Sequence, residues 1–175
     1  MSFCIFAFTL TLTIRMADRF SKLLNPACMK LSLAGTQKDA AIEEVARLLD
    51  GQPGMTDFRG FYRDLLAREE LDTTCFGYEI AMPHGRTTHV SKIMLAVGRS
   101  DAGIAYPDSN EKMRMLFVLA TPKNAPDEYL SAISEMCRLL HIPENRDALL
   151  NAPTPDAFIK TVAAAEEKLP PLAAH

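Results

Sequence analysis

Apolar residues early in the chain recur at the spacing of an amphipathic helix. Four of them stand at positions i, i+3, i+4 and i+7, namely Ile42, Val45, Ala46 and Leu49. Thr36 has the residue type of an N-cap, and Gly51 stands where a glycine commonly ends a helix. Together these residues predict a helix over residues 36–50.

A second helical pattern follows the loop at residues 52–54. It predicts a helix over residues 56–70 with Arg68 in its last turn, where a cation interacts favourably with the helix dipole. The expected buried side of this helix consists of Phe58, Phe61, Tyr62, Leu65 and Leu66.

The middle of the chain carries short apolar runs that fit strands. Residues 93–97 form one run, and residues 113–120 form a nearly continuous second run that suits a central strand covered on both faces. Residues 104–106 are a third candidate strand, closed by a turn at residues 107–110.

Helical spacing returns after residue 122, where an apolar stripe predicts a helix that Pro143 ends. The stripe consists of Leu130, Ile133, Cys137 and Leu140, with Met136 beside it. Two further helices are predicted over residues 144–150 and 154–166.

The last predicted helix has Thr154 as its N-cap and Pro155 at its first position, a common way for a helix to begin. Residues 167–175 include two consecutive prolines and are expected to fray. Helices come first, strands second and helices last. This order predicts an α/β fold with a single mixed β-sheet flanked by helices on both faces.

Composition agrees with one folded domain. Of the 175 residues, 48% are hydrophobic and 23% are charged, which excludes a disordered chain, a collagen-like chain and a polytopic membrane protein. The net charge of −3 leaves no cationic surplus for a phosphate backbone, so nucleic acid is not an expected partner. The four cysteines form no C-x-x-C pair and have no histidine at zinc-ligand spacing, so we expect free thiols, no metal site and a cytoplasmic location.

The first 16 residues differ in character from the rest. Residues 1–14 carry no charge, yet they lack the positive start of a signal peptide and are too short for the roughly 20 residues of a membrane span. Two alternatives stay open: a misassigned start, because Met16 opens an ordinary polar sequence, or an added strand or contact arm. We therefore expect residues 1–16 to be an N-terminal apolar extension of the domain.

The sequence IAMPHG at residues 80–85 presents a histidine between two residues with special backbones. Pro83 stiffens the approach to His84, and Gly85 would let another molecule come close to the imidazole. An imidazole with an ordinary pKa near 6.5 is a nucleophile at neutral pH. The residues alone leave open a plain loop histidine bonded to a carbonyl.

The segment from Arg68 to Gly85 resembles the active-site motif of fructose/mannitol-type IIA domains of the bacterial phosphoenolpyruvate-dependent sugar phosphotransferase system. This family includes the nitrogen-regulatory IIA proteins. The matching features are arginine-glutamate, three residues, the hydroxyl pair Thr73-Thr74, a glycine, and I-A-x-P-H-G. The similarity runs from about residue 19 to about residue 166, and we expect a IIA domain over residues 17–166.

The resemblance implies that His84 accepts a phosphoryl group and that Arg68 helps to hold it. Thr73, Thr74 and Gly85 are then expected to contact the group, and no cofactor, nucleotide or metal is needed because the donor is a phosphohistidine. A histidine phosphocarrier protein is the implied donor. A IIB domain, a permease, or a regulated transporter or kinase is the implied recipient of the group or of the signal.

One position departs from the family pattern. Tyr129 stands where the family usually carries a second histidine, and a tyrosine can donate a hydrogen bond to a phosphoryl oxygen but carries no positive charge at pH 7. The departure favours a specialised or regulatory member. Two functions therefore stay open: a phosphocarrier in sugar uptake or nitrogen-type regulation, or a non-catalytic regulatory binding module on the same fold. The sugar, the regulated partner and the oligomeric state are left open as well.

Overall fold

The computed structural model describes residues 19–107, 109–124 and 126–170, and it leaves out the side chains of residues 126–129. The predicted N-terminal extension and the last five residues lie outside this range. Within the described residues, no helix combines the length and apolar character needed to cross a membrane.

One six-stranded mixed sheet forms the centre of the molecule. Its order is β1-β5-β6-β3-β2, with β4 also paired to β6. β5 and β6 are antiparallel, whereas β3 and β4 both run parallel to β6. The strands are β1 (Met29–Lys30), β2 (Cys75–Gly77), β3 (Ile80–Ala81), β4 (His84–Thr87), β5 (Met94–Ile104) and β6 (Met113–Pro122).

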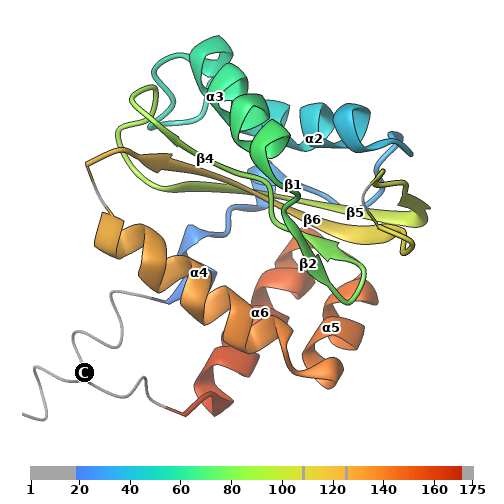
Figure 1. Cartoon of the computed structure of the whole chain (residues 1–175). Helices are drawn as coiled ribbons and strands as arrows, with labels where there is room; N and C mark the ends of the chain where they lie inside the picture. Colours follow the sequence, from blue (N-terminus) through green and yellow to red (C-terminus); the bar gives the residue numbers. More distant parts are fainter. Residues whose placement is uncertain (1–18, 108, 125, 171–175) are drawn as a thin grey trace, which may run out of the picture.

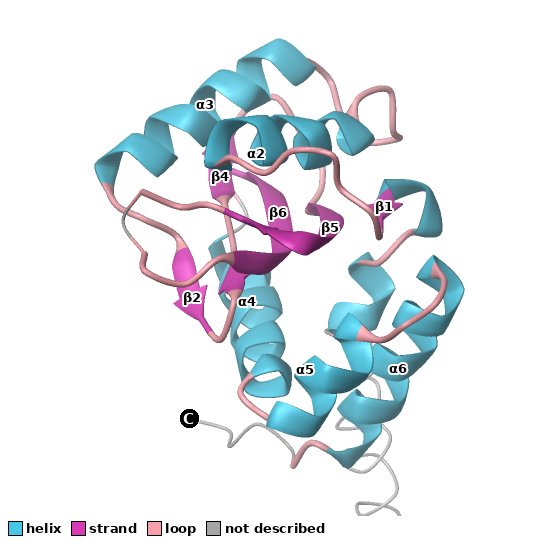
Figure 2. Ribbon diagram, turned by 90° about the vertical axis from the view of Figure 1, so that its right-hand side faces the viewer, coloured by secondary structure: helices cyan, strands magenta, loops and turns pink. Residues whose placement is uncertain are grey.

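Within the described part of the chain, five α-helices cover the two faces of this sheet. α2 and α3 lie on one face, and α4, α5 and α6 lie on the other (Figure 1). The view turned by 90° shows the same three layers (Figure 2). The helices are α2 (Lys38–Ala46), α3 (Phe58–Leu71), α4 (Pro126–Leu140), α5 (Pro143–Leu150) and α6 (Pro155–Lys168), with short 3₁₀ helices η1 (Phe20–Leu23), η2 (Pro26–Cys28) and η3 (Arg47–Leu49).

Each face of the sheet has its own apolar core. Ile42, Phe61 and Leu65 are completely buried between the sheet and the pair α2 and α3. Phe117 and Phe158 are completely buried on the opposite face, against α4 and α6. The predicted α/β fold, a mixed sheet with helices on both faces, is confirmed.

The start of α2 differs from its prediction. Its N-cap is Gln37, whose side chain makes no capping bond, and the carbonyl of Thr36 accepts a hydrogen bond from the backbone of Ala105. Thr36 was therefore the wrong N-cap, because its backbone pairs with the segment after β5. Gly51 is confirmed in the left-handed conformation beyond the helix, with φ of +70°.

β5 is one long strand where the sequence predicted two short ones. The polar residues Arg99 and Asp101 interrupt the apolar run, but the strand continues across an irregularity to Ile104. Gly103 supplies a φ of +76° at this bulge. The hydrophobic pattern failed here because the bulged part of the strand is half exposed.

The apolar stripe of α4 was also placed partly wrongly. Leu130 is 61% exposed, and the completely buried residues are Met136, Leu139 and Leu140. The buried face is thus rotated from the predicted one. The predicted start of the last helix is confirmed, since the Thr154 hydroxyl accepts a hydrogen bond from the amide of Ala157. Its predicted end was wrong, because α6 continues to Lys168 and Leu169 is buried in the core.

Close packing of α2 on β5 predicts the effect of adding one methyl group. A Cβ at Gly98 would lie 2.3 Å from Cγ2 of Val45 and 2.8 Å from Cδ1 of Leu33. Gly98→Ala should lower the free energy of unfolding by about 1–3 kcal/mol through overpacking, measured by urea denaturation. Adding Val45→Ala should relieve part of this loss. Strictly additive losses in the double variant would contradict the packing explanation.

Candidate functional site

His84 is the first residue of β4, at an edge of the sheet. The pairs Ala81 with Leu116 and His84 with Leu119 show that β3 and β4 follow β6 in one register, with residues 82–83 as a short interruption. The sequence left open that His84 is a plain loop histidine. The histidine instead lies on a paired strand, because the residues before and after the proline both pair with β6.

Gly85 faces the side of the sheet that carries α3, opposite to the side that His84 faces. Its ideal Cβ position is 3.3 Å from the backbone N and Cα of Leu65 in α3. The close approach that the glycine permits is therefore to α3 of the same chain. Successive strand residues point to opposite faces, so His84 lies on the side of the sheet that carries α4.

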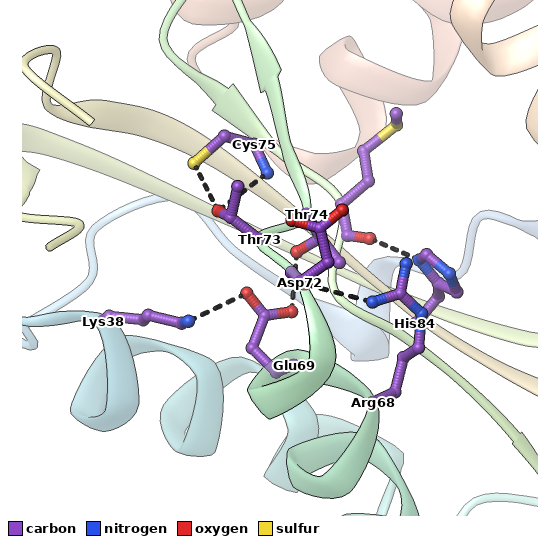
Figure 3. Close-up of polar contacts among 9 residues, drawn as sticks. Lys38, Arg68, Glu69, Asp72, Thr73, Thr74, Cys75 and His84 are labelled. Atoms are coloured by element: carbon purple, nitrogen blue, oxygen red, sulfur yellow. Dashed lines mark hydrogen bonds and ion pairs between the residues drawn. The ribbon is translucent and has the colours of Figure 1, made fainter. Parts of the chain in front are cut away.

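The imidazole of His84 is fixed by its own backbone. Its Nδ1 lies 2.9 Å from the carbonyl oxygen of Met82, so the neutral ring donates from Nδ1 and carries its lone pair on Nε2. Figure 3 shows the guanidinium of Arg68, at the end of α3, beside this ring. Arg68 itself donates to the carbonyl oxygen of Asp72 at 3.0 Å.

The environment lowers the pKa of His84 below its ordinary value. Burial has the largest effect, because it disfavours the charged form. The bond to the Met82 carbonyl raises the pKa, the positive charge of Arg68 lowers it, and the negative charge of Glu69 raises it. The ring is therefore kept in its neutral, nucleophilic form near neutral pH.

The two threonines make different contacts. The Thr74 side chain is buried, and its hydroxyl donates to Oε2 of Glu69 at 2.7 Å. The Thr73 hydroxyl contacts Sγ of Cys75 at 3.3 Å and accepts from the Cys75 amide. Of the predicted site residues, the structure places Arg68 beside His84, whereas the two threonine hydroxyls contact Cys75 and Glu69 and Gly85 faces α3. Tyr129 lies in α4, but its side chain is outside the described part of the chain.

Sequence reasoning missed Lys38, Glu69 and Met82. Glu69 follows Leu65 by four residues, so helical spacing places it on the buried side of α3, and a carboxylate there signals a buried polar contact. Lys38 could not be found in this way, since it lies 31 residues before Glu69, in α2.

Comparison with known proteins identifies the class to which this fold and site belong. The model of the family "Phosphoenolpyruvate-dependent sugar phosphotransferase system, EIIA 2" matches residues 22–165. The chain belongs to this family. It is a phosphotransferase relay component, because IIA domains receive a phosphoryl group from a phosphocarrier and pass it on through a phosphohistidine.

Relatives occur in both sugar transport and regulation. A nitrogen regulatory protein of Pseudomonas aeruginosa is 30% identical over 82% of the chain and 94% of its own length. A fructose-specific EIIABC component of Bacillus subtilis is also 30% identical over 82% of the chain, which spans 23% of that longer relative. The structure of the nitrogen regulatory protein IIA-Ntr of Neisseria meningitidis has a TM-score of 0.74 at 24% identity, covering 81% of the chain and 97% of that chain.

The charge next to the imidazole predicts a measurable shift. Arg68→Gln removes a positive charge that lowers the pKa of His84, so the titration midpoint of the imidazole should move to higher pH in ¹⁵N NMR. Arg63→Gln, five residues earlier on the exposed side of α3, is the control and should leave the midpoint unchanged. An unchanged midpoint in Arg68→Gln would show that the guanidinium does not act on the ring.

Proposed function

We propose that His84 is the phosphoryl acceptor of this IIA domain and that Nε2 is the reacting atom. The observation that carries the proposal is the bond from Nδ1 to the carbonyl oxygen of Met82, which keeps the proton on Nδ1 and the lone pair on Nε2. The pKa of the ring is lowered, mainly by burial, so most of the imidazole is neutral near pH 7.

The proposed step is an in-line exchange between two imidazoles. The Nε2 lone pair of His84 forms a bond to phosphorus while the nitrogen–phosphorus bond of the donor phosphohistidine breaks, and the donor ring leaves with that electron pair. No proton has to move, because His84 keeps its Nδ1 proton and becomes positively charged. The carbonyl of Met82 stabilises this developing charge.

Arg68 is the proposed binding residue for the phosphoryl oxygens. A guanidinium offers several donors in a plane and matches the oxygens of a phosphoryl group. The positive charge that lowers the pKa of His84 before transfer would attract the phosphoryl group during transfer. Thr73 and Tyr129 remain proposed contacts of the same group, whereas the Thr74 hydroxyl is bonded to Glu69 and Gly85 faces α3.

The proposed donor is a histidine phosphocarrier protein. IIA domains of this family act with phosphocarriers and with IIB domains, and the Bacillus subtilis relative is itself named an EIIABC component. We propose that this chain passes the phosphoryl group to a IIB domain or uses it as a regulatory signal towards a permease, transporter or kinase. The free thiols of Cys28, Cys75 and Cys137 support a reducing, cytoplasmic location.

The proposed domain covers residues 17–166, with residues 1–16 as an extension and residues 167–175 as a tail. The family match over residues 22–165 supports these limits. The contact of η1 with α4 also supports an early start, because the amide of Phe20 donates to Glu135 at 2.9 Å.

A phosphorylation assay tests the proposal directly. The full chain is incubated with phosphoenolpyruvate, enzyme I and a histidine phosphocarrier, and acid-labile phosphate is measured. The wild type should be labelled and His84→Ala should not, while Arg68→Gln should be labelled roughly a hundredfold more slowly. ¹⁵N NMR of the labelled protein should place the phosphorus on Nε2.

The matched control is His141→Ala, since His141 is an exposed histidine at the end of α4. It should be labelled at the wild-type rate. Equal labelling of His84→Ala and wild type would refute the proposal. Absence of label on the wild type would favour the regulatory binding module, whose partner should then bind wild type and His84→Ala equally well.

A further inference from the structure

A buried carboxylate lies directly beside the residue proposed to hold the phosphoryl group. Glu69 follows Arg68 in α3, and consecutive helical residues point about 100° apart. The two side chains therefore point in different directions: the Arg68 guanidinium lies beside the imidazole, and the Glu69 side chain turns inward and is only 4% exposed. Burying a carboxylate is costly unless its oxygens find partners, so the contacts of Glu69 are informative.

Each oxygen of this carboxylate faces a different element. Oε1 lies 3.2 Å from Nζ of Lys38, the first residue of α2, and Oε2 accepts the hydroxyl of Thr74 at 2.7 Å. The ammonium of Lys38 is itself covered, with 14% of its side chain exposed and the ring of Tyr106 at 5.6 Å. Figure 3 shows the side chains of Lys38, Glu69 and Thr74 converging between α2, α3 and the segment before β2.

The contacts continue without a break to the imidazole. The carbonyl of Thr74 accepts the amide of Met82 at 2.9 Å, and the carbonyl of Met82 accepts Nδ1 of His84 at 2.9 Å. Lys38, Glu69, Thr74, Met82 and His84 thus form one chain of polar contacts. Its far end is fixed as well, because the amide of Lys38 donates to the carbonyl of Ala105.

We propose that Glu69, held by Lys38, is a positioning residue that sets the place and orientation of His84 for phosphoryl transfer. This inference rests on the proposed function of His84. Transfer between two imidazoles depends on alignment more than on acid–base chemistry, so a small displacement of Met82 would misdirect Nε2. Glu69 acts through Thr74 and Met82 and does not itself touch the phosphoryl group.

The negative charge of Glu69 also reaches the ring. It raises the pKa of His84, against the larger lowering by burial and the lowering by Arg68. Lys38 is paired with this carboxylate, and Tyr106 lies beside the pair with its pKa raised by burial first and then by the charges of Glu69, Cys75 and Asp39. The two effects of Glu69 can therefore be measured separately: the titration midpoint of His84 reports its charge, and the rate of phosphoryl transfer reports the alignment of the ring.

The test compares Glu69→Gln with Glu70→Gln in the full chain. Glu70 is the next residue and is exposed, so the matched change removes the same charge outside the contact chain. Glu69→Gln should move the ¹⁵N titration midpoint of His84 to lower pH. It should also slow phosphorylation by the histidine phosphocarrier roughly tenfold or more. Glu70→Gln should match wild type in both measurements.

A second variant guards against loss of folding. Lys38→Met combined with Glu69→Gln replaces the buried ion pair by neutral groups, which folded proteins often tolerate. If Lys38 acts through Glu69, the double variant should slow transfer no more than Glu69→Gln alone. A further additive loss would show that Lys38 acts independently and would overturn that part of the inference.

The outcomes separate the two proposals. If wild type is phosphorylated on His84 but Glu69→Gln transfers as fast as Glu70→Gln, the positioning role is overturned whatever the midpoint does, and the proposed function stands. If wild type accepts no phosphoryl group, the proposed function fails. The NMR titration then still decides whether Glu69 acts on the imidazole.

Discussion

The parallel pairing of β4 with β6 is the constraint on which the rest of the site depends. It fixes the backbone of His84 opposite Leu119, near the end of the most deeply buried strand. It also turns Gly85 towards α3, where the absence of a side chain lets the helix approach to van der Waals contact. The end of α3 then places Arg68 beside the imidazole and Glu69 about 100° away around the helix. Without this pairing, the position of the imidazole relative to the guanidinium would not be fixed.

The general fold could be predicted from the sequence because its two strongest signals are periodic. The apolar run of β6 and the helical spacing of apolar residues in α3 mark the side chains that are buried. Burial of these side chains also decides where the two elements pack. The prediction failed where local signals competed with tertiary contacts. Thr36 resembled an N-cap but uses its carbonyl to bind Ala105, and β5 continues through polar residues because its ladder to β6 resumes after a bulge.

The candidate site could be predicted only in part for a related reason. His84 and Arg68 belong to a linear motif, so sequence similarity was enough to select them. Lys38 contributes through a contact between residues far apart in the chain, and nothing in its neighbourhood sets it apart from other helix-start lysines. Residues that bind a substrate can be grouped in sequence, whereas those that support them are defined by the fold.

The placement of His84 on a paired strand has an entropic consequence. A histidine on a loose loop must lose backbone freedom each time a partner protein binds, and that loss weakens a transient complex. The strand backbone here has lost this freedom during folding, and the ring is held by the Met82 carbonyl. A short-lived encounter between two relay proteins can therefore be productive as soon as the two surfaces meet in the correct orientation.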